Sequence, residues 1–119
     1  MTGYNQGDII LIPFPFTDFS TFKQRPAVVI SSDHFNQTHQ DVIVAAITSH
    51  IPDHIAEDEY LLSVDELKPT GLPKASLIKL GKIVTIDQRL IRKRLGALPE
   101  KTPGKIILKL HKVVGSLSV

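Results

Sequence analysis

Cysteine and tryptophan are absent from the 119-residue sequence, and aromatic residues make up only 6% of it. The lack of cysteine excludes disulfides, thiolate metal sites and a cysteine nucleophile. No apolar run approaches the roughly 20 residues that are needed to span a bilayer. Residues 1–6 are polar and uncharged, unlike the basic and then apolar start of a signal peptide. We therefore expect a cytoplasmic protein that does not enter membranes.

Basic residues are scarce in the first half of the chain, and acidic residues are scarce in the second. Residues 1–60 carry two basic and eight acidic side chains, whereas residues 61–119 carry twelve basic and four acidic ones. The second half therefore supplies the positive field that a polyanion such as RNA requires. Lysines that only keep a small protein soluble would give the same count. The length fits one compact domain, residues 1–119, and no repeat or linker divides it.

Short segments separated by proline and glycine predict a mainly β protein. Residues 8–13 form a continuous apolar run of the length of a buried strand, which Pro13 and Pro15 are expected to end. A loop is expected over residues 14–24, and residues 33–40 fit either a turn or a short helix. Further strands are expected at residues 26–32, 41–50, 59–64, 75–80 and 82–86, with a bulge at Gly81. Strands at such close intervals favour a small barrel over a parallel α/β sheet.

The clearest helical pattern lies at the C-terminus. Thr102 is a suitable N-cap, and Pro103 suits the first helical turn. The apolar residues that follow recur at helical spacing and are Ile106, Ile107, Leu110, Val113, Val114 and Leu117. Lys105, Lys109 and Lys112 fall on the other side, which is the pattern of a solvated face over a stripe that packs on a core.

Two polar residues lie where strands are expected to begin or end. Arg25 stands at the junction of the loop and the second strand, from which a side chain can project into a groove. In the strand at 41–50, polarity begins abruptly at Thr48, and alternation puts Thr48 and His50 on one face. A satisfied residue at the edge of a strand would give the same pattern, so these residues alone leave both interpretations open.

The histidines do not predict a metal site. His50 and His54 have the spacing of ligands on one helical face, but Pro52 lies between them and disfavours a helix there. No metal and no cofactor is therefore expected. His50 could serve as an auxiliary proton donor beside Thr48, or it could simply be an exposed histidine at the end of a strand.

Several sequence blocks, taken in order, resemble the MazF/PemK (Kid) toxins. They span nearly the whole chain and are Gly7-Asp8-Ile9-Ile10, Arg25-Pro26-Ala27-Val28-Val29-Ile30, Ala45-Ala46-Ile47-Thr48, Ser76-Leu77-Ile78-Lys79 and Thr85-Ile86-Asp87. The C-terminal amphipathic helix continues the resemblance. The stretch Pro13-Phe14-Pro15-Phe16-Thr17-Asp18 is similar to a branch often called PemK-like growth inhibitors. Each block is weak alone, and the ordered set is specific.

The resemblance implies a homodimeric, SH3-like β-barrel of the MazF/PemK/CcdB type with a C-terminal helix. It implies the toxin of a type II toxin–antitoxin system, an mRNA interferase that cleaves single-stranded RNA without a metal. A cognate antitoxin would hold it inactive, and the complex of the two could bind operator DNA. The catalytic arginine of the family falls on Arg25 and its catalytic threonine on Thr48. Attack by the RNA 2′-hydroxyl would leave a 2′,3′-cyclic phosphate and a 5′-hydroxyl.

The RNA-binding residues that we expect from the resemblance and the sequence pattern surround the catalytic pair. They are Thr17, Phe19, Thr21, Phe22, Lys23, His50, Ser76 and Lys79. The segment before Arg25 departs from the family, because the acidic residue that many members carry there is absent. Phe19 and Phe22 could stack on splayed bases, or they could anchor the loop on the barrel.

Two other functions compete with the nuclease. A gyrase poison of the CcdB kind shares the fold, but that group relies on a C-terminal Trp-Gly-Ile, which this chain lacks. A catalytically inactive relative would bind RNA or a protein partner without cleaving. The presence of both Arg25 and Thr48 argues against this second alternative.

Overall fold

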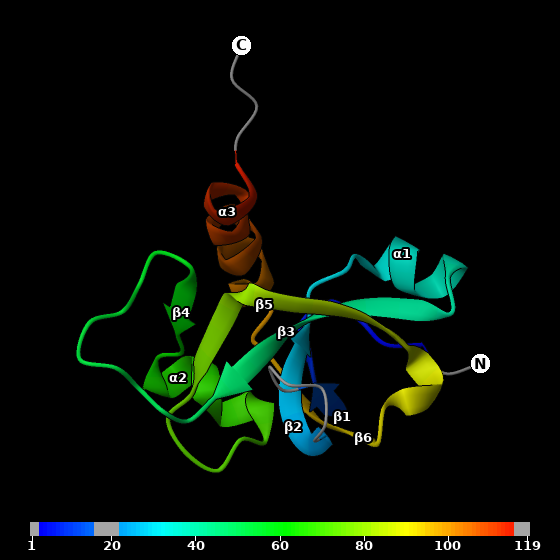
Figure 1. Cartoon of the computed structure of the whole chain (residues 1–119), viewed down its shortest axis with the longest axis horizontal. Helices are drawn as coiled ribbons and strands as arrows, with labels where there is room; N and C mark the ends of the chain where they lie inside the picture. Colours follow the sequence, from blue (N-terminus) through cyan, green and yellow to red (C-terminus); the bar gives the residue numbers. More distant parts are fainter. Residues whose placement is uncertain (1–2, 16–21, 116–119) are drawn as a thin grey trace.

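One antiparallel sheet of six strands organises residues 3–15 and 22–115, the part of the chain that the computed structural model describes (Figure 1). The strands are β1 (Asp8–Pro15), β2 (Phe22–Val29), β3 (Asp41–Thr48), β4 (Glu59–Leu61), β5 (Leu77–Asp87) and β6 (Lys93–Ala97). The helices are α1 (Asp33–Thr38), α2 (Val64–Leu67) and α3 (Thr102–Val114), with 3-10 turns η1 (Lys68–Thr70) and η2 (Gln88–Leu90).

The strand order in the sheet is β4-β5-β3-β2-β1-β6, and every neighbouring pair is antiparallel. The mainly β class with a C-terminal helix is thereby confirmed. In the described ranges, the two edge strands, β4 and β6, do not pair with each other, so hydrogen bonds do not close the sheet into a barrel. β6 has no counterpart among the expected strands.

The β1–β2 hairpin runs through the two prolines that were expected to end the first strand. That expectation is wrong, and so is the loop over residues 14–24 where β1 and β2 occupy it. Because the Arg92 N–H donates to the Leu11 carbonyl, the odd-numbered residues of this stretch direct their backbone groups towards β6. β6 pairs with β1 only over residues 8–11. Pro13 and Pro15 therefore interrupt no ladder.

β5 runs through the segments expected as strand at 75–80 and 82–86, with a bulge where Gly81 predicted one. The pairing of β5 with β3 skips residues 80–82 between Ala45 and Ala46. Three extra residues reverse the alternation of side chains, because the side-chain period of a strand is two. The two halves of β5 thus present residues of the same parity to opposite faces of the sheet.

Apolar side chains form a core on each face of the sheet. The first core packs against α3 and contains Ile9, Val28, Ile30, Ala45, Ile47, Leu62, Ile78, Leu80, Leu98 and Ile106. The second core, on the opposite face, contains Ile10, Ile12, Ala27, Val29, Val42 and Val44. The bulge explains why Ile78 belongs to the first core whereas Val84 packs against the second.

Helix α3 forms as expected but begins differently. Thr102 is not the N-cap: Lys101 occupies that position, and the Thr102 hydroxyl donates instead to the Glu66 carboxylate at 3.0 Å. The apolar stripe is confirmed for the residues that pack on the first core, which are Ile106, Ile107, Leu110 and Val113. Val114 is 72% exposed and does not contribute, and Leu117 lies outside the described residues.

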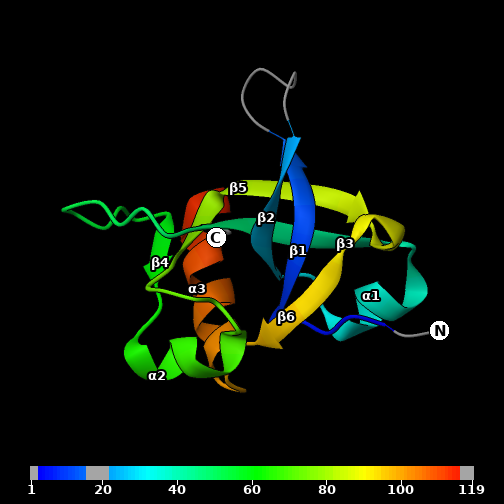
Figure 2. The same ribbon diagram turned by 90° about the horizontal axis from the view of Figure 1, so that it is seen from below.

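The polar segment at 33–40 forms α1, and the strand expected at 59–64 is shortened by a second helix. Ser63 caps α2 in a capping box with Glu66, which ends β4 at Leu61. Figure 2 shows α2 and α3 on the side of the molecule that carries β4, with α1 at the other end. No helix within residues 3–15 and 22–115 is long and apolar enough to cross a membrane.

Candidate functional site

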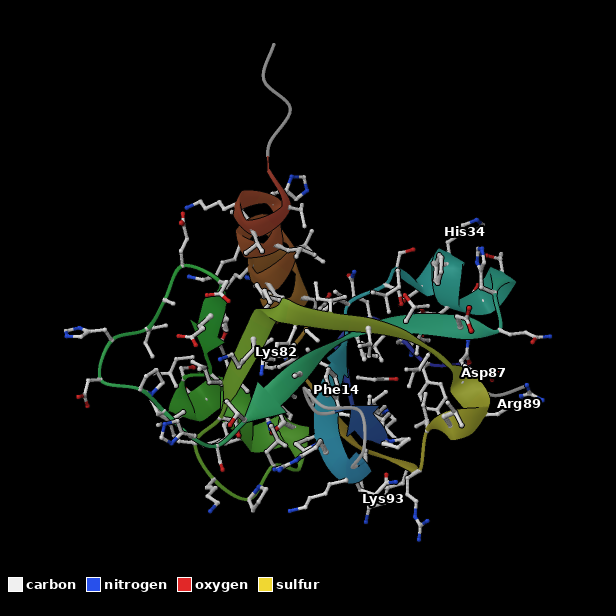
Figure 3. All side chains as sticks on the ribbon, viewed as in Figure 1. Phe14, His34, Lys82, Asp87, Arg89 and Lys93 are labelled. Carbon is white, nitrogen blue, oxygen red and sulfur yellow. The ribbon has the colours of Figure 1, made fainter. Side chains whose placement is uncertain are left out.

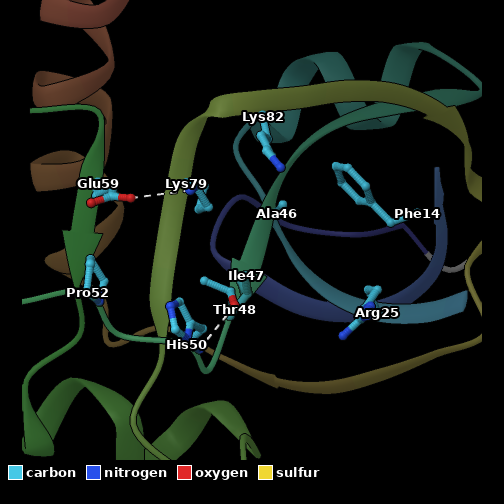
Figure 4. A pocket seen from close by; sticks show the side chains of 10 residues that line it. All are labelled: Phe14, Arg25, Ala46, Ile47, Thr48, His50, Pro52, Glu59, Lys79 and Lys82. Atoms are coloured by element: carbon cyan, nitrogen blue, oxygen red, sulfur yellow. Dashed lines mark hydrogen bonds and ion pairs between the residues drawn. The ribbon is translucent and has the colours of Figure 1, made fainter. Parts of the chain in front are cut away.

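A groove of about 340 Å³ opens beside the end of β3, where β2, β3 and β5 meet (Figure 4). The side chains that line it are Phe14, Arg25, Ala46, Ile47, Thr48, His50, Pro52, Glu59, Lys79 and Lys82. Arg25, Lys79 and Lys82 bring three cationic side chains to one hollow, with Glu59 as the single carboxylate among the lining residues. This charge favours an anionic ligand.

The strand register places Arg25 and Thr48 on the same face of the sheet. Ala27 of β2 lies opposite Ala46 of β3. This is the last pair of the β2–β3 ladder, and Arg25 and Thr48 each lie two residues beyond it, so alternation keeps both on the face of the alanines. The Arg25 side chain is exposed and Thr48 is half-buried. The two residues that the sequence singled out therefore share one groove.

A local hydrogen bond orients Thr48. Its hydroxyl oxygen accepts the backbone N–H of His50 at 3.1 Å, an arrangement typical of a threonine that starts a turn. The hydroxyl hydrogen can still be donated to a ligand. His50 is exposed and lines the groove beside Thr48, although β3 ends at Thr48 and the strand expected to continue to His50 does not.

Lys79, which the sequence analysis expected to bind RNA, lines the groove. Phe14, Lys82 and Glu59 also line it, and the sequence analysis did not identify them as site residues. Phe14 was assigned to a loop, although it lies in β1 and packs against the second core. Lys82 lies in the β5 bulge, and the glycine beside it was the signal that could have found it. Glu59 becomes visible only through the pairing of β4 with β5, which sets it opposite Lys79.

Two other expected RNA-binding residues, Ser76 and Lys23, do not line the groove. Ser76 is buried, and its hydroxyl donates to the Lys74 carbonyl at 2.8 Å. Lys23 is exposed on β2 but is not among the lining residues. Three others, Thr17, Phe19 and Thr21, lie outside the described residues, as does the side chain of Phe22.

Asp87, which belongs to one of the sequence blocks above, lies away from the groove. It caps η2 by accepting the Arg89 N–H at 2.8 Å, and the two side chains form an ion pair at 2.9 Å. These hydrogen bonds hold the pKa of Asp87 below its ordinary value. Figure 3 shows Asp87 and Arg89 at the far end of β5, whereas Lys82 and Phe14 lie near the middle of the sheet. Asp87 is therefore a turn residue in this fold.

No group of three or more histidines and carboxylates in the described ranges is arranged to hold a metal ion. The chemistry of the groove instead combines a guanidinium, two ammonium groups, a hydroxyl and an imidazole. These groups donate hydrogen bonds to anionic oxygens, and phosphate is the biological anion that most often meets such a set.

Residues 5–114 match the family described as PemK-like, MazF-like toxin of type II toxin-antitoxin system. The chain belongs to this family. A comparison with curated protein sequences finds no match. The family match includes every described residue of the groove, and the blocks that suggested the resemblance all fall within it.

Solved structures share the fold at low sequence identity. An endoribonuclease in complex with its cognate antitoxin, from a mycobacterial species, is 15% identical with a TM-score of 0.76, over 98% of this chain and 99% of that chain. MazF from Deinococcus radiodurans is 18% identical with a TM-score of 0.74, over 98% and 100%. The MazE–MazF complex of the same organism is 19% identical with a TM-score of 0.71, over 98% and 100%.

Proposed function

We propose that this member of the family is a single-domain toxin, residues 1–119, that cleaves single-stranded RNA without a metal ion. The observation that carries the proposal is that Arg25 and Thr48 line one cationic groove. Family membership supports the toxin role, and a protein of the same fold is an endoribonuclease bound to its antitoxin.

The reaction follows from the chemistry of RNA. The 2′-hydroxyl next to the scissile phosphate attacks phosphorus in line and loses its proton. The bond from phosphorus to the 5′ oxygen breaks, and that oxygen takes up a proton. The products are a 2′,3′-cyclic phosphate and a 5′-hydroxyl. Because the RNA itself supplies the nucleophile, the reaction needs no metal-bound water.

Arg25 and Thr48 have distinct tasks in this scheme. Charge grows on the two non-bridging phosphate oxygens in the transition state, and a guanidinium can donate to both at once. Arginine stays protonated, so Arg25 acts by electrostatic stabilisation and not as a general base. The Thr48 hydroxyl donates to the same phosphate and fixes its orientation. His50, beside Thr48, is a candidate for donating a proton to the leaving 5′ oxygen.

The antitoxin is expected to use the same groove. An acidic, extended segment would meet the charge of Arg25, Lys79 and Lys82 much as an RNA backbone does, and it would order on binding. The resemblance also leads us to expect a symmetric homodimer. Light scattering at micromolar concentration tests the dimer, and a monomer there would count against it.

One experiment tests the nuclease directly. The purified protein is incubated with long single-stranded RNA in EDTA, and the ends of the fragments are mapped. Cleavage with 2′,3′-cyclic phosphate ends is expected, and a single 2′-deoxy substitution at the cut site should abolish it. Intact RNA under all conditions would favour a relative that only binds. Cleavage of the deoxy-substituted RNA would exclude attack by the 2′-hydroxyl.

A further inference from the structure

The wall of the groove that lies across from Arg25 carries a fixed ion pair. The Glu59 Oε2 and the Lys79 Nζ are 3.3 Å apart. The other oxygen of Glu59 accepts the Ala56 N–H at 2.8 Å. Glu59 is only 7% exposed, whereas the Lys79 side chain is 30% exposed and reaches the groove. One member of the pair is anchored in the protein, and the other faces the ligand site.

The backbone holds the two side chains opposite each other. Lys79 pairs with Glu59 of β4 on one side and with Ala46 of β3 on the other. The Leu80 N–H donates to the Asp58 carbonyl at 2.7 Å, which extends the β4–β5 ladder by one bond. The row from Ala46 through Lys79 to Glu59 thus crosses three strands on the face that carries Thr48.

We propose that Glu59 is a positioning residue, which holds the Lys79 ammonium on the groove wall so that it can bind a phosphate of the RNA. The inference rests on the proposed ribonuclease function and adds a residue to that site. An ammonium has three donors, so Lys79 can keep its contact with Glu59 while it donates to a phosphate oxygen. Without a partner, its four-carbon stem would occupy many rotamers, so the ammonium would still attract RNA but would seldom hold the phosphate in the position that cleavage requires.

Glu59 places a negative charge inside a groove that is proposed to bind RNA. The hydrogen bond from Ala56 and the Lys79 ammonium hold the pKa of Glu59 below its usual range, despite its burial. Glu59 is therefore an anion at neutral pH inside a groove that binds an anion. Removal of the Glu59 charge should tighten RNA binding, because it removes a repulsion between two anions. The same change should slow cleavage, because the Lys79 ammonium is no longer held in place. If Glu59 only stabilised the fold, its substitution would not tighten RNA binding while it slows cleavage.

The test compares Glu59→Gln with Glu57→Gln. Glutamine keeps the size of the side chain and an oxygen for the Ala56 N–H, but it removes the charge. Glu57 is exposed and does not line the groove. Its substitution therefore makes the same change in net charge at a position outside the proposed RNA site. We expect kcat to fall roughly 10- to 100-fold in Glu59→Gln, with KM unchanged or lower. Glu57→Gln should keep kcat.

Binding is measured separately by fluorescence anisotropy with a cleavage-resistant oligonucleotide that carries a 2′-deoxy group at the cut site. Glu59→Gln should bind this probe at least as tightly as the unsubstituted protein. In a Lys79→Gln background, Glu59→Gln should cause no further loss of kcat, because its partner is already gone. This comparison keeps the proposal testable if Glu59→Gln alone proves unstable.

The failures of the two proposals are distinguishable. If the unsubstituted protein does not cleave RNA, the proposed function is wrong. If it cleaves, and Glu59→Gln and Glu57→Gln behave alike, Glu59 has no positioning role. A loss of probe binding in Glu59→Gln, at unchanged melting temperature, would also overturn the inference, as would additive losses in the double variant.

Discussion

Arg25 illustrates how the shape of a side chain, as well as its charge, can decide a role. The proposed reaction needs two donors in one plane, directed at two phosphate oxygens. Arg25→Ala should therefore lower the cleavage rate by about 100- to 1,000-fold, the usual cost of losing one preorganised donor to transition-state charge. Arg25→Lys should recover only part of the rate, since an ammonium cannot bridge both oxygens. Single-turnover cleavage checks this, and near-normal rates in a folded Arg25→Ala would contradict the mechanism.

Thr48 offers a complementary test, because its hydroxyl can be removed without a change of shape. Thr48→Val keeps the branched side chain of a strand residue but loses both the acceptor for the His50 N–H and the proposed donor to phosphate. Its cleavage rate should fall about 10- to 100-fold, as expected when a reacting group is misplaced. Thr48→Ser should keep measurable activity. Equal rates in the two variants, at similar melting temperatures, would show that the hydroxyl has no role.

The sequence allowed part of the site to be predicted at the level of single residues. Arg25 and Thr48 stood out because polarity begins there next to apolar strands, and the structure sets them in one groove. Glu59 and Lys82 do not stand out by such a change of polarity, and only Gly81 beside Lys82 gives a signal in the sequence. Their positions depend on the β4–β5 register and on a bulge that reverses the faces of β5, and both are set by pairing between distant segments.

At the scale of elements, two glycines that look alike in the sequence have opposite surroundings. A Cβ on Gly96 would overlap the backbone of Pro69 and Thr70, whereas nothing lies within 4 Å of a Cβ on Gly104, in the first turn of α3. Gly96→Ala should therefore destabilise the fold by more than about 1 kcal/mol, as overpacking does. Gly104→Ala should stabilise it by about 0.4–1 kcal/mol. Chemical denaturation measures both, and equal effects would mean that η1 does not pack on β6 as described.

Glu66 connects three elements through its carboxylate. Burial alone would raise its pKa, but hydrogen bonds from Ser63, Tyr60 and Thr102 outweigh this and lower the pKa below its ordinary value. Burial and the neighbouring Glu66 carboxylate raise the pKa of Tyr60, so its phenol stays protonated and donates at 2.6 Å. The carboxylate thereby joins β4, α2 and the start of α3.

The pH dependence of this connection has a definite sign. A carboxyl group whose pKa is lower in the folded state adds stability above its unfolded pKa, and that stability is lost as the pH falls through the folded value. Glu66→Gln should therefore lower the melting temperature more at pH 7 than at pH 3. At pH 7 the cost should be about 1–2 kcal/mol, allowing for partial exposure. A cost that did not depend on pH would contradict a role for the charge.

Elements with a local apolar pattern could be predicted from the sequence, whereas β6 could not. The apolar stripe of α3 and the β-branched runs at 26–32 and 41–50 predicted that α3, β2 and β3 exist, because local periodicity reflects burial. Their bounds differ, since β2 spans Phe22–Val29 and β3 ends at Thr48. β6, with the sequence Lys-Arg-Leu-Gly-Ala, shows no such alternation, and its strand conformation comes from pairing with β1. The prolines of β1 misled for the same reason, since only the neighbouring strand determines whether a missing N–H matters.

At the scale of the whole molecule, the fold brings strands from the acidic first half and the basic second half of the chain side by side. β5, from the basic half, inserts between β3 and β4 of the acidic half, and its two groove lysines join Arg25. The net charge of +2 is small, so a general attraction for RNA would be weak. Binding should instead depend on where the cations lie.

This view leads to a prediction that separates the local groove from the overall charge. Lys82→Gln and Lys105→Gln make the same change in net charge, but Lys82 lines the groove whereas Lys105 is exposed on α3 and does not line it. For single strands, each neutralised phosphate adds about −0.7 to the slope of log K against log salt concentration. Lys82→Gln should therefore make the slope shallower by about 0.7, and Lys105→Gln should leave it unchanged.

Anisotropy titrations of the cleavage-resistant oligonucleotide, at several salt concentrations, provide both slopes. Melting temperatures should be the same for both variants, because each side chain is exposed. Equal changes of slope would mean that RNA responds to the total charge of the molecule and not to the groove. A change confined to Lys105→Gln would place the RNA path along α3, away from Arg25 and Thr48. Only a change confined to Lys82→Gln agrees with a phosphate backbone that crosses the sheet between β2 and β5.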